Sequence, residues 1–276
     1  MNPLLRAAYR LDPALWAEAV LGLDLDPWQA QLLLTPGGAQ VVVLAARQAG
    51  KTSAAAVAVA HEMAFRPGSL SVFAAPSQRQ SAEAVRRVRT YLATAGVKVS
   101  TANVFGLETE TGARVMALPG SDDSVRGLSV DAVVAADEAA RLTPELLAAL
   151  RPMRARHSRT SRLMMLSTAW TTTDPFWQVW ADVADTSWVR IRATADTIAR
   201  YSPDFLGAEE RALGRRAFRR EYHGEPLGSD AAAFDGRLVT ALFDCQRADQ
   251  PSGSTELPPE QVVTRSLAFA KIRLWS

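Results

Sequence analysis

The sequence has little cysteine and no long apolar run. Its single cysteine, Cys245, excludes an internal disulfide, and a lone thiol is typical of a reducing compartment. No stretch approaches the roughly 18 uninterrupted apolar residues that a membrane-spanning helix needs. The amino terminus also lacks the apolar core and cleavage-like site of a secretory signal. These absences predict a cytoplasmic chain without a disulfide framework or a membrane segment.

Lysine is scarce, and the charges nearly cancel. The 31 basic residues oppose 29 acidic ones and leave a net charge of +2, which does not by itself indicate a nucleic-acid-binding protein. Only Lys51, Lys98 and Lys271 are lysines, so the basic residues are mainly arginines, which favour bidentate phosphate and carboxylate contacts. With 48% hydrophobic residues over 276 positions, the chain can bury the core of one large domain, or of one domain plus an extension.

Lys51 lies in the string AARQAGKTS, residues 45–53, which follows an apolar run and precedes an alanine-rich stretch. Strand, tight loop and helix in this order are typical of a phosphate-binding loop, whose N–H groups face the phosphates. Lys51 would contact the β- and γ-phosphates of ATP, and Thr52 would contact Mg²⁺. Ala45 replaces the first glycine of the usual pattern. The alternative at this point is an ordinary strand-to-helix turn with a surface lysine.

A second segment, VDAVVAADEAAR at residues 130–141, ends an apolar run in Asp137 and Glu138. The pattern predicts a buried parallel strand that presents acidic side chains at its carboxyl end. Asp137 there would hold Mg²⁺, and Glu138 would orient and deprotonate the attacking water. The alternative is a surface acidic pair that caps the next helix. The phosphate-loop segment makes this alternative much weaker.

Elsewhere the pattern alternates between strands and helices, which predicts an α/β fold with a mainly parallel sheet and helices on both faces. The predicted strands are 40–45, 70–75, 97–104, 113–117, 131–136, 162–166 and 188–192. The predicted helices are two within 3–35, then 52–65, 78–95, 144–150, 175–184 and 202–222. Residues 223–260 are rich in Gly, Ser, Pro and acidic residues and predict a linker or an extended tail.

This set of motifs resembles the ATPase domain of the large terminase subunit, the motor that packages DNA into tailed-phage capsids. The family's phosphate loop typically reads Arg-Gln-x-Gly-Lys-Thr, as residues 47–52 do, and it tolerates alanine in place of the first glycine. The resemblance covers about residues 10–235 and implies an additional-strand P-loop NTPase fold. The other matching segments are Pro27–Trp28–Gln29, Arg126–Gly127, the coupling motif LSTAW at 166–170 with Trp170 in place of the usual proline, and 218–234.

The resemblance implies a role for each matching residue. Glu138, Arg47 and Lys51 would be catalytic, with Arg47 an arginine finger within the same subunit, or in the alternative a surface loop arginine. Thr52 and Asp137 would hold Mg²⁺. Gln29 would read the adenine edge, Trp28 would lie nearby or pack in the core, and Thr168 would sense the γ-phosphate. The implied ATP-binding residues are Trp28, Gln29, Gln48, Ala49, Gly50, Lys51, Thr52, Ser53 and Thr168.

The family's domain layout predicts four parts. They are a helical segment with the adenine-side motif at 1–35, a P-loop ATPase core at 36–200, a helical lid or linker at 201–235, and a truncated carboxyl-terminal extension at 236–276. Full-length members also carry a nuclease domain, whose two-metal chemistry needs converging carboxylates. After Phe234 the acids are scattered, and we expect no nuclease activity. The scattered acids are Asp235, Asp244, Asp249, Glu256 and Glu260.

The family resemblance also implies partners: double-stranded DNA, a portal protein, a small terminase subunit and a homo-oligomeric ring in the cytoplasm of a bacterial host. A motor that moves any sequence must grip phosphates rather than bases. Two arginine groups are candidates, although a charge run is usually a solvated face. They are Arg151, Arg154, Arg156, Arg159 and Arg162, and then Arg215, Arg216, Arg219 and Arg220.

Two other functions stay open from the sequence. One is a helicase-like P-loop ATPase, which the Arg-Gln pair before Gly50 and the lack of a second motor domain argue against. The other is a degenerate prophage remnant that binds nucleotide without turnover. Truncation and Trp170 favour the remnant, whereas the intact Lys51, Thr52, Asp137 and Glu138 oppose it.

Overall fold

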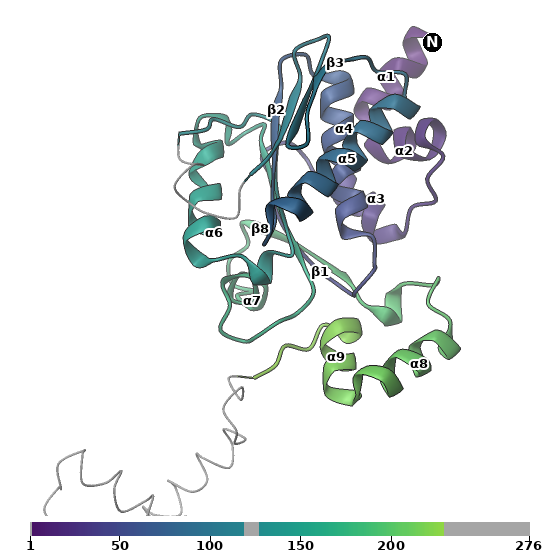
Figure 1. Ribbon diagram of the computed structural model, residues 1–276, viewed down its shortest axis with the longest axis vertical. Coiled ribbons are helices and arrows are strands. Elements are labelled where there is room, and N and C mark those ends of the chain that lie inside the picture. The colour runs from purple at the N-terminus through teal and green to yellow at the C-terminus, as the bar shows by residue number, and fades with distance from the viewer. Residues whose placement is uncertain (1, 119–126, 229–276) are drawn as a thin grey trace, which may run out of the picture. The chain divides into compact units, whose positions relative to one another are not determined.

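A computed structural model of the chain describes residues 2–118 and 127–228 (Figure 1). Its centre is an eight-stranded sheet in the order β3-β4-β5-β2-β6-β7-β1-β8. All neighbouring strands pair in parallel except at one edge, where β4 runs antiparallel to β3 and β5. The strands are β1 (Gln40–Ala45), β2 (Leu70–Ala74), β3 (Val99–Ala102), β4 (Gly106–Thr109), β5 (Arg114–Ala117), β6 (Val133–Asp137), β7 (Arg162–Ser167) and β8 (Trp188–Ala193).

The position of β7 sets the geometry of the carboxyl-terminal edge of the sheet. It pairs with β1 on one side and with β6 on the other, in a register that aligns Leu44 with Ser167 and Asp137 with Leu166. The strand before the phosphate loop and the strand that carries the acids are therefore separated by one added strand. This is the additional-strand order, and it brings the loop, Thr168 and the acidic pair to the same edge of the sheet.

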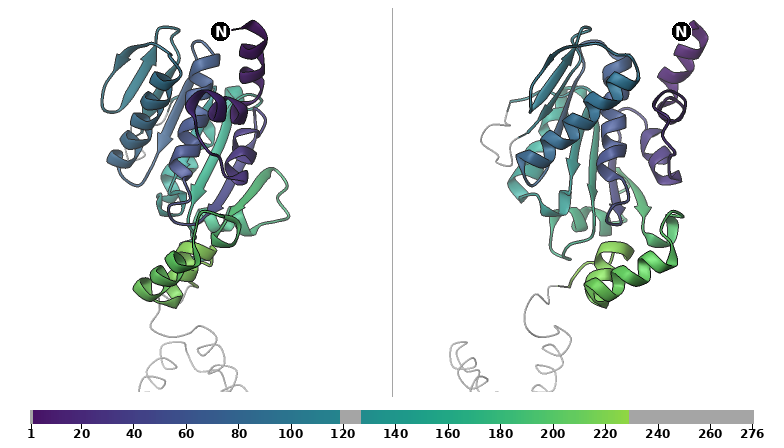
Figure 2. Two further views of the ribbon diagram at one scale, coloured as in Figure 1. Left: turned by 90° about the vertical axis from the view of Figure 1, so that its right-hand side faces the viewer. Right: turned by 45° about the vertical axis from the view of Figure 1, so that its right-hand side comes forward.

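Helices cover both faces of the sheet (Figures 1 and 2). On one face, α4 is buried along most of its length, because its small alanine side chains allow close packing on the sheet and on α2, α3 and α5. On the other face, α6 and α7 cover a second apolar cluster. The helices are α1 (Pro3–Leu11), α2 (Pro13–Leu21), α3 (Pro27–Leu33), α4 (Lys51–Phe65), α5 (Gln78–Thr94), α6 (Pro144–Leu150), α7 (Pro175–Ala181), α8 (Pro203–Leu213) and α9 (Arg215–His223).

Local sequence explains where the amino-terminal helices begin. Pro13 and Pro27 occupy the first turns of α2 and α3, where a missing N–H costs nothing. The Asp12 carboxylate accepts a hydrogen bond from Leu15 N at 2.8 Å. Gln29 completes a capping box on α3 by accepting from Asp26 N at 2.9 Å through its Oε1. Short helical turns at η2 (Ala139–Arg141), η3 (Pro152–His157) and η4 (Ala195–Thr197) complete the described elements.

The structure confirms the predicted α/β fold and departs from the predicted elements in three places. Three helices, α1, α2 and α3, lie within 3–35, where the sequence analysis expected two. The sequence analysis missed β4, which forms a tight hairpin with β3, with Asn103 Oδ1 accepting from Phe105 N at 2.8 Å. The predicted helix at 202–222 is two helices, because Gly214 between them has a φ of 76°. The predicted carboxyl-terminal extension, like the predicted Arg126 match, lies outside the described residues. Over 2–118 and 127–228, no helix is both long and apolar enough to cross a membrane.

A candidate nucleotide-binding site

The phosphate loop turns tightly between β1 and α4. Gln48 and Gly50 have φ values of 60° and 91°, both in the left-handed region. The positive φ favours glycine at position 50, and a Cβ there would also come within 2.7 Å of Nε2 at the end of the Gln29 side chain. Ala45, in the position of the missing glycine, is the last residue of β1 and pairs with Ala193 of β8, a position that alanine fills without strain. The loop therefore closes with one glycine.

Lys51 and Glu138 face each other across the site. The Lys51 ammonium lies 3.4 Å from Glu138 Oε1 and donates to Ala46 O at 3.3 Å. Only 6% of the lysine side chain is exposed, against 29% for Glu138. A buried cation is stable only where it is paired and hydrogen-bonded, so the loop carbonyl and the carboxylate hold this ammonium at the mouth of the loop.

Asp137 contacts the first turn of α4. The Thr52 hydroxyl donates to Asp137 Oδ2, which joins the residue after the lysine to the end of β6. Burial raises the pKa of Asp137, and neighbouring Glu138 adds to this, whereas the Thr52 hydrogen bond and Lys51 oppose the shift. A nearby cation would favour the charged carboxylate.

The turn after β6 is strained at Glu138. This residue has φ 51° and ψ 44°, a left-handed backbone conformation that residues other than glycine rarely adopt. Two hydrogen bonds support the turn: Glu138 N donates to Asp137 Oδ1 at 3.1 Å, and Ala140 N donates to Ser167 Oγ at 3.2 Å. From this turn the Glu138 carboxylate contacts Lys51.

These side chains fit a Mg²⁺-bound triphosphate. The Thr52 hydroxyl and an Asp137 carboxylate oxygen meet, and both are the hard oxygen ligands that Mg²⁺ prefers. Mg²⁺ usually takes one or two protein ligands and completes its shell with water and phosphate, so a larger cluster is not needed. Within the described ranges no group of three or more His, Cys, Asp or Glu side chains forms a separate metal site.

The remaining predicted residues lie around the loop, with one exception. Gln29 Nε2 donates to Gly50 O at 3.5 Å, and Ser53 Oγ accepts from Arg87 Nη1 at 3.2 Å. Thr168, 4% exposed, directly follows β7 at the same edge of the sheet. The exception is Trp28, which is 5% exposed within the hydrophobic core, so the structure supports the core-packing interpretation of this ring.

Arg47 is exposed, but its backbone is fixed on both sides. Its N–H donates to Glu221 O at 2.7 Å, and its carbonyl accepts from the Tyr201 hydroxyl at 2.8 Å. Arg200 contacts the next two carbonyls of the loop. The sequence analysis gave no role to Arg87, Arg200 or Tyr201, because each lies far along the chain from the motif that it contacts. One sequence signal could have pointed to Arg200: it lies shortly after the last predicted strand, 188–192, and therefore near the end of that strand.

Trp170, where the family's coupling motif usually has proline, links the site to the lid helices. The guanidinium groups of Arg141 and Arg220 lie over its ring at 4.1 and 4.3 Å from the centroid. Arg141 belongs to η2, directly after Glu138, and Arg220 to α9. Leu227 N also donates to Trp170 O at 3.0 Å. The ring therefore joins the acidic turn to the segment that leads out of the core.

The structure corrects two of the predicted DNA-contacting arginines. Arg162 is 3% exposed and binds Glu62 Oε1 at 3.2 Å and Leu33 O at 3.1 Å. Arg154 is 7% exposed and donates to the carbonyls of Gly38 and Ser158. Both were assigned to a surface because the sequence shows charge but not burial, and neither can reach a DNA backbone. The predicted arginines that the structure leaves exposed are Arg151, Arg156, Arg159, Arg215, Arg216 and Arg219.

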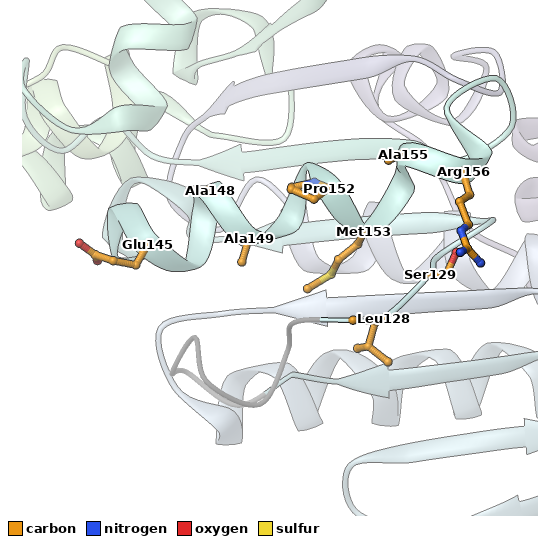
Figure 3. Close-up of a pocket in the computed structure, with 10 residues that line it drawn as sticks. Leu128, Ser129, Glu145, Ala148, Ala149, Pro152, Met153, Ala155 and Arg156 are labelled. Carbon is orange, nitrogen blue, oxygen red and sulfur yellow. The ribbon is translucent and has the colours of Figure 1, made fainter.

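A groove of about 750 Å³ lies apart from these groups, between the stretch before β6 and the helices α6 and η3 (Figure 3). Its lining is largely apolar, with Leu128 and Met153, and has Glu145 and Arg156 at its margins. None of the predicted nucleotide-binding residues lines it. The candidate nucleotide site is therefore identified from the contacts between its side chains, and not from this groove.

A parallel sheet with an added strand, a left-handed loop ending in Gly-Lys-Thr and an Asp-Glu pair opposite it define a P-loop NTPase of the α/β class. The chain belongs to the terminase large subunit family: the profile of the T4likevirus-type, N-terminal region of that subunit matches residues 42–241. No curated protein matches the chain.

Solved structures of phage terminases share the fold. A mutant of the large terminase ATPase domain of Thermus phage P74-26 superposes with a TM-score of 0.67 at 16% identity, covering 79% of this chain and 100% of that one. The large terminase of another thermophilic bacteriophage, in complex with ADP, gives 0.60 at 14% identity, covering 73% of this chain and 53% of that one. The same terminase in complex with ATP-gamma-S gives the same values. At these identities the likeness establishes the fold.

Proposed function

We propose that this chain is a Mg²⁺-dependent ATPase whose turnover drives double-stranded DNA into a phage procapsid. The observation that carries the proposal is the meeting of Lys51, Thr52, Asp137 and Glu138 at one edge of the sheet. Membership of the terminase family and the ADP and ATP-gamma-S complexes of the thermophilic bacteriophage terminase support ATP as the nucleotide.

Each side chain has one task in this proposal. Lys51 exchanges its carboxylate partner for the phosphates of ATP, which frees Glu138 to accept a proton from water. Thr52 and Asp137 hold Mg²⁺, which neutralises charge on the phosphates when it is bound. The exposed Arg47 side chain stabilises charge at the γ-phosphate. Gln29 binds the adenine edge, and Thr168, directly after the strand β7 between the two motifs, responds to the γ-phosphate.

The family supports a proposal for the chain's parts and partners. Residues 1–35 form the adenine-side segment, 36–200 the ATPase core and 201–235 the lid. The working form is a homo-oligomeric ring on a portal protein, with a small terminase subunit and DNA, in the cytoplasm of the bacterial host. Exposed arginines such as Arg156, Arg159, Arg215 and Arg216 grip the DNA backbone.

Phosphate release by the purified chain tests this proposal. We expect hydrolysis of ATP with Mg²⁺, stimulation by double-stranded DNA, and loss of turnover in Lys51→Ala and Glu138→Gln. A wild-type chain that releases no phosphate with or without Mg²⁺, DNA and portal would refute the proposal. If that chain still binds ATP, it is a remnant that retains the first step only, whereas strand separation on a forked duplex would indicate a helicase.

A further inference from the structure

The outer side of the phosphate loop is hydrogen-bonded at four consecutive carbonyls. Arg47 O accepts from the Tyr201 hydroxyl at 2.8 Å, and Gln48 O and Ala49 O accept from Arg200 Nη2 at 3.3 and 2.6 Å. Gly50 O accepts from Gln29 Nε2 at 3.5 Å. We refer to Gln29, Arg200 and Tyr201 as the carbonyl clamp.

Peptide planarity gives the clamp a consequence for the inner side of the loop. A carbonyl and the N–H of the next residue point in opposite directions, so fixing a carbonyl outward fixes that N–H toward the site. The Ala49 N–H, which follows the Gln48 carbonyl, donates to Ala46 O at 3.3 Å within the loop. The N–H groups of Gln48 and Gly50, which follow the Arg47 and Ala49 carbonyls, donate to no residue in the described part of the chain. These are donors of the kind that cradle phosphate in such a loop.

The charge and protonation of the clamp suit this role. Arg200 brings a guanidinium behind the loop and is itself held by the Asp26 carboxylate at the start of α3. Its hydrogen bond to Ala49 O polarises the peptide group that ends in the free Gly50 N–H. Burial raises the pKa of Tyr201, so its hydroxyl stays protonated and donates at neutral pH.

The clamp also connects the loop to the lid. Arg200 and Tyr201 lie between η4 and α8, and the Tyr201 ring stacks on Phe205 of α8 at 5.8 Å. From α9, Glu221 O accepts the Arg47 N–H at 2.7 Å. The backbone of Arg47 is thus held on one side by the start of α8 and on the other by α9.

We propose that Arg200 and Tyr201 are positioning residues that orient the N–H groups of the phosphate loop, so that the lid sets the affinity for nucleotide. The inference rests on the proposed function, since it concerns the same site. It adds that two residues outside every nucleotide motif, about 150 positions from the loop, control how tightly phosphate is bound.

Matched tyrosine variants test the inference with the loss of one hydroxyl. Tyr201→Phe removes the bond to Arg47 O and keeps the ring. Tyr222→Phe removes a hydroxyl from the same aromatic cluster that instead contacts Glu209 Oε2 at 2.8 Å. Calorimetric titration with Mg–ADP should show affinity about 2- to 10-fold weaker in Tyr201→Phe, the range expected for one hydrogen bond, and little change in Tyr222→Phe.

Arginine variants supply a second measurement. Arg200→Met should weaken Mg–ADP binding more than Tyr201→Phe does, and Arg200→Lys should restore part of the loss because a cation remains behind the loop. Arg211→Met, an exposed position on α8, is the control. Melting temperatures without nucleotide separate positioning from simple support of the fold.

The outcomes are distinct. Wild-type affinity in Tyr201→Phe and Arg200→Met, or lower melting temperatures with unchanged ADP affinity, would overturn the inference and leave the proposed function intact. A wild-type chain that binds no Mg–ADP would instead defeat the proposed function and the inference together.

Discussion

The core and the lid contribute to one site in different ways. The core supplies side chains within two short motifs, residues 45–53 and 130–141, each at the end of a buried strand. The segment at 200–228, which begins at the end of the proposed core and continues into the proposed lid, supplies contacts that match no nucleotide motif. Among the residues that make them are Arg200, Tyr201 and Arg220. Residues that contact phosphate or metal lie next to each other in a short motif, because the loop backbone sets their spacing. Residues that support the loop from outside can come from any segment that packs against it.

The largest expected effect is at Glu138, and it tests the claim that the core motifs carry the catalytic side chains. Glu138→Gln keeps the shape of the side chain and removes its basicity, so we expect turnover to fall about 10²- to 10⁴-fold while Mg–ATP still binds. Glu145→Gln, an exposed acid on α6, should keep wild-type turnover. Equal phosphate-release rates in the two variants would remove Glu138 from the catalytic site.

A second prediction asks whether charge in the core segment at 151–162 is structural. Arg162→Met leaves Glu62 and the carbonyl of Leu33 without this buried partner, which should lower the free energy of unfolding by about 3–5 kcal/mol. Denaturant unfolding measures this, with the exposed Arg159→Met as the control. Unchanged stability together with weaker DNA binding in Arg162→Met would restore this arginine to the DNA surface.

A third prediction concerns pH and Asp137. The raised pKa means that the folded state holds this proton more tightly than the unfolded state does. Without Mg²⁺, the stabilising contribution is therefore present at low pH and is lost as pH rises through the folded pKa. Asp137→Asn should remove that loss and melt higher than wild type at neutral pH, while no longer responding to Mg²⁺.

Thermal melting from acidic to neutral pH, with and without Mg²⁺, measures this difference. Asp204→Asn, at an exposed position on α8, controls for the loss of one negative charge. If Asp137→Asn melts lower than wild type in metal-free buffer at neutral pH, burial does not penalise this carboxylate, and the explanation of its pKa is wrong.

The smallest effect concerns the exposed arginines. Arg156→Ala combined with Arg159→Ala should reduce the salt dependence of DNA binding by about 0.9 in the logarithmic slope for each lost phosphate contact. Arg6→Ala combined with Arg10→Ala removes the same charge from α1 and should not change it. A slope lowered equally by both pairs would indicate net charge rather than a defined DNA surface.

The sequence predicted most of the fold and singled out the four motif residues that the structure brings together. Apolar runs predicted all described strands except β4, whose four residues are divided between buried and half-buried positions. Prolines at the first helical position predicted where several helices begin. The four motif residues were predictable because each pair, Lys51–Thr52 and Asp137–Glu138, lies in a short motif directly after an apolar strand. The burial of Arg162 and the clamp contacts of Arg200 and Tyr201 were not, since both depend on contacts between segments 100 or more positions apart.

Calorimetric titration with Mg–ATP-gamma-S of the wild type, Lys51→Ala and Lys98→Ala tests the central claim most directly. Lys98 is the other lysine in the described part of the chain and lies on the surface, 3.9 Å from Glu110. We predict binding by the wild type and Lys98→Ala, and its loss in Lys51→Ala. Equal affinity in all three proteins would contradict the claim that Lys51 and the acidic pair enclose one nucleotide site.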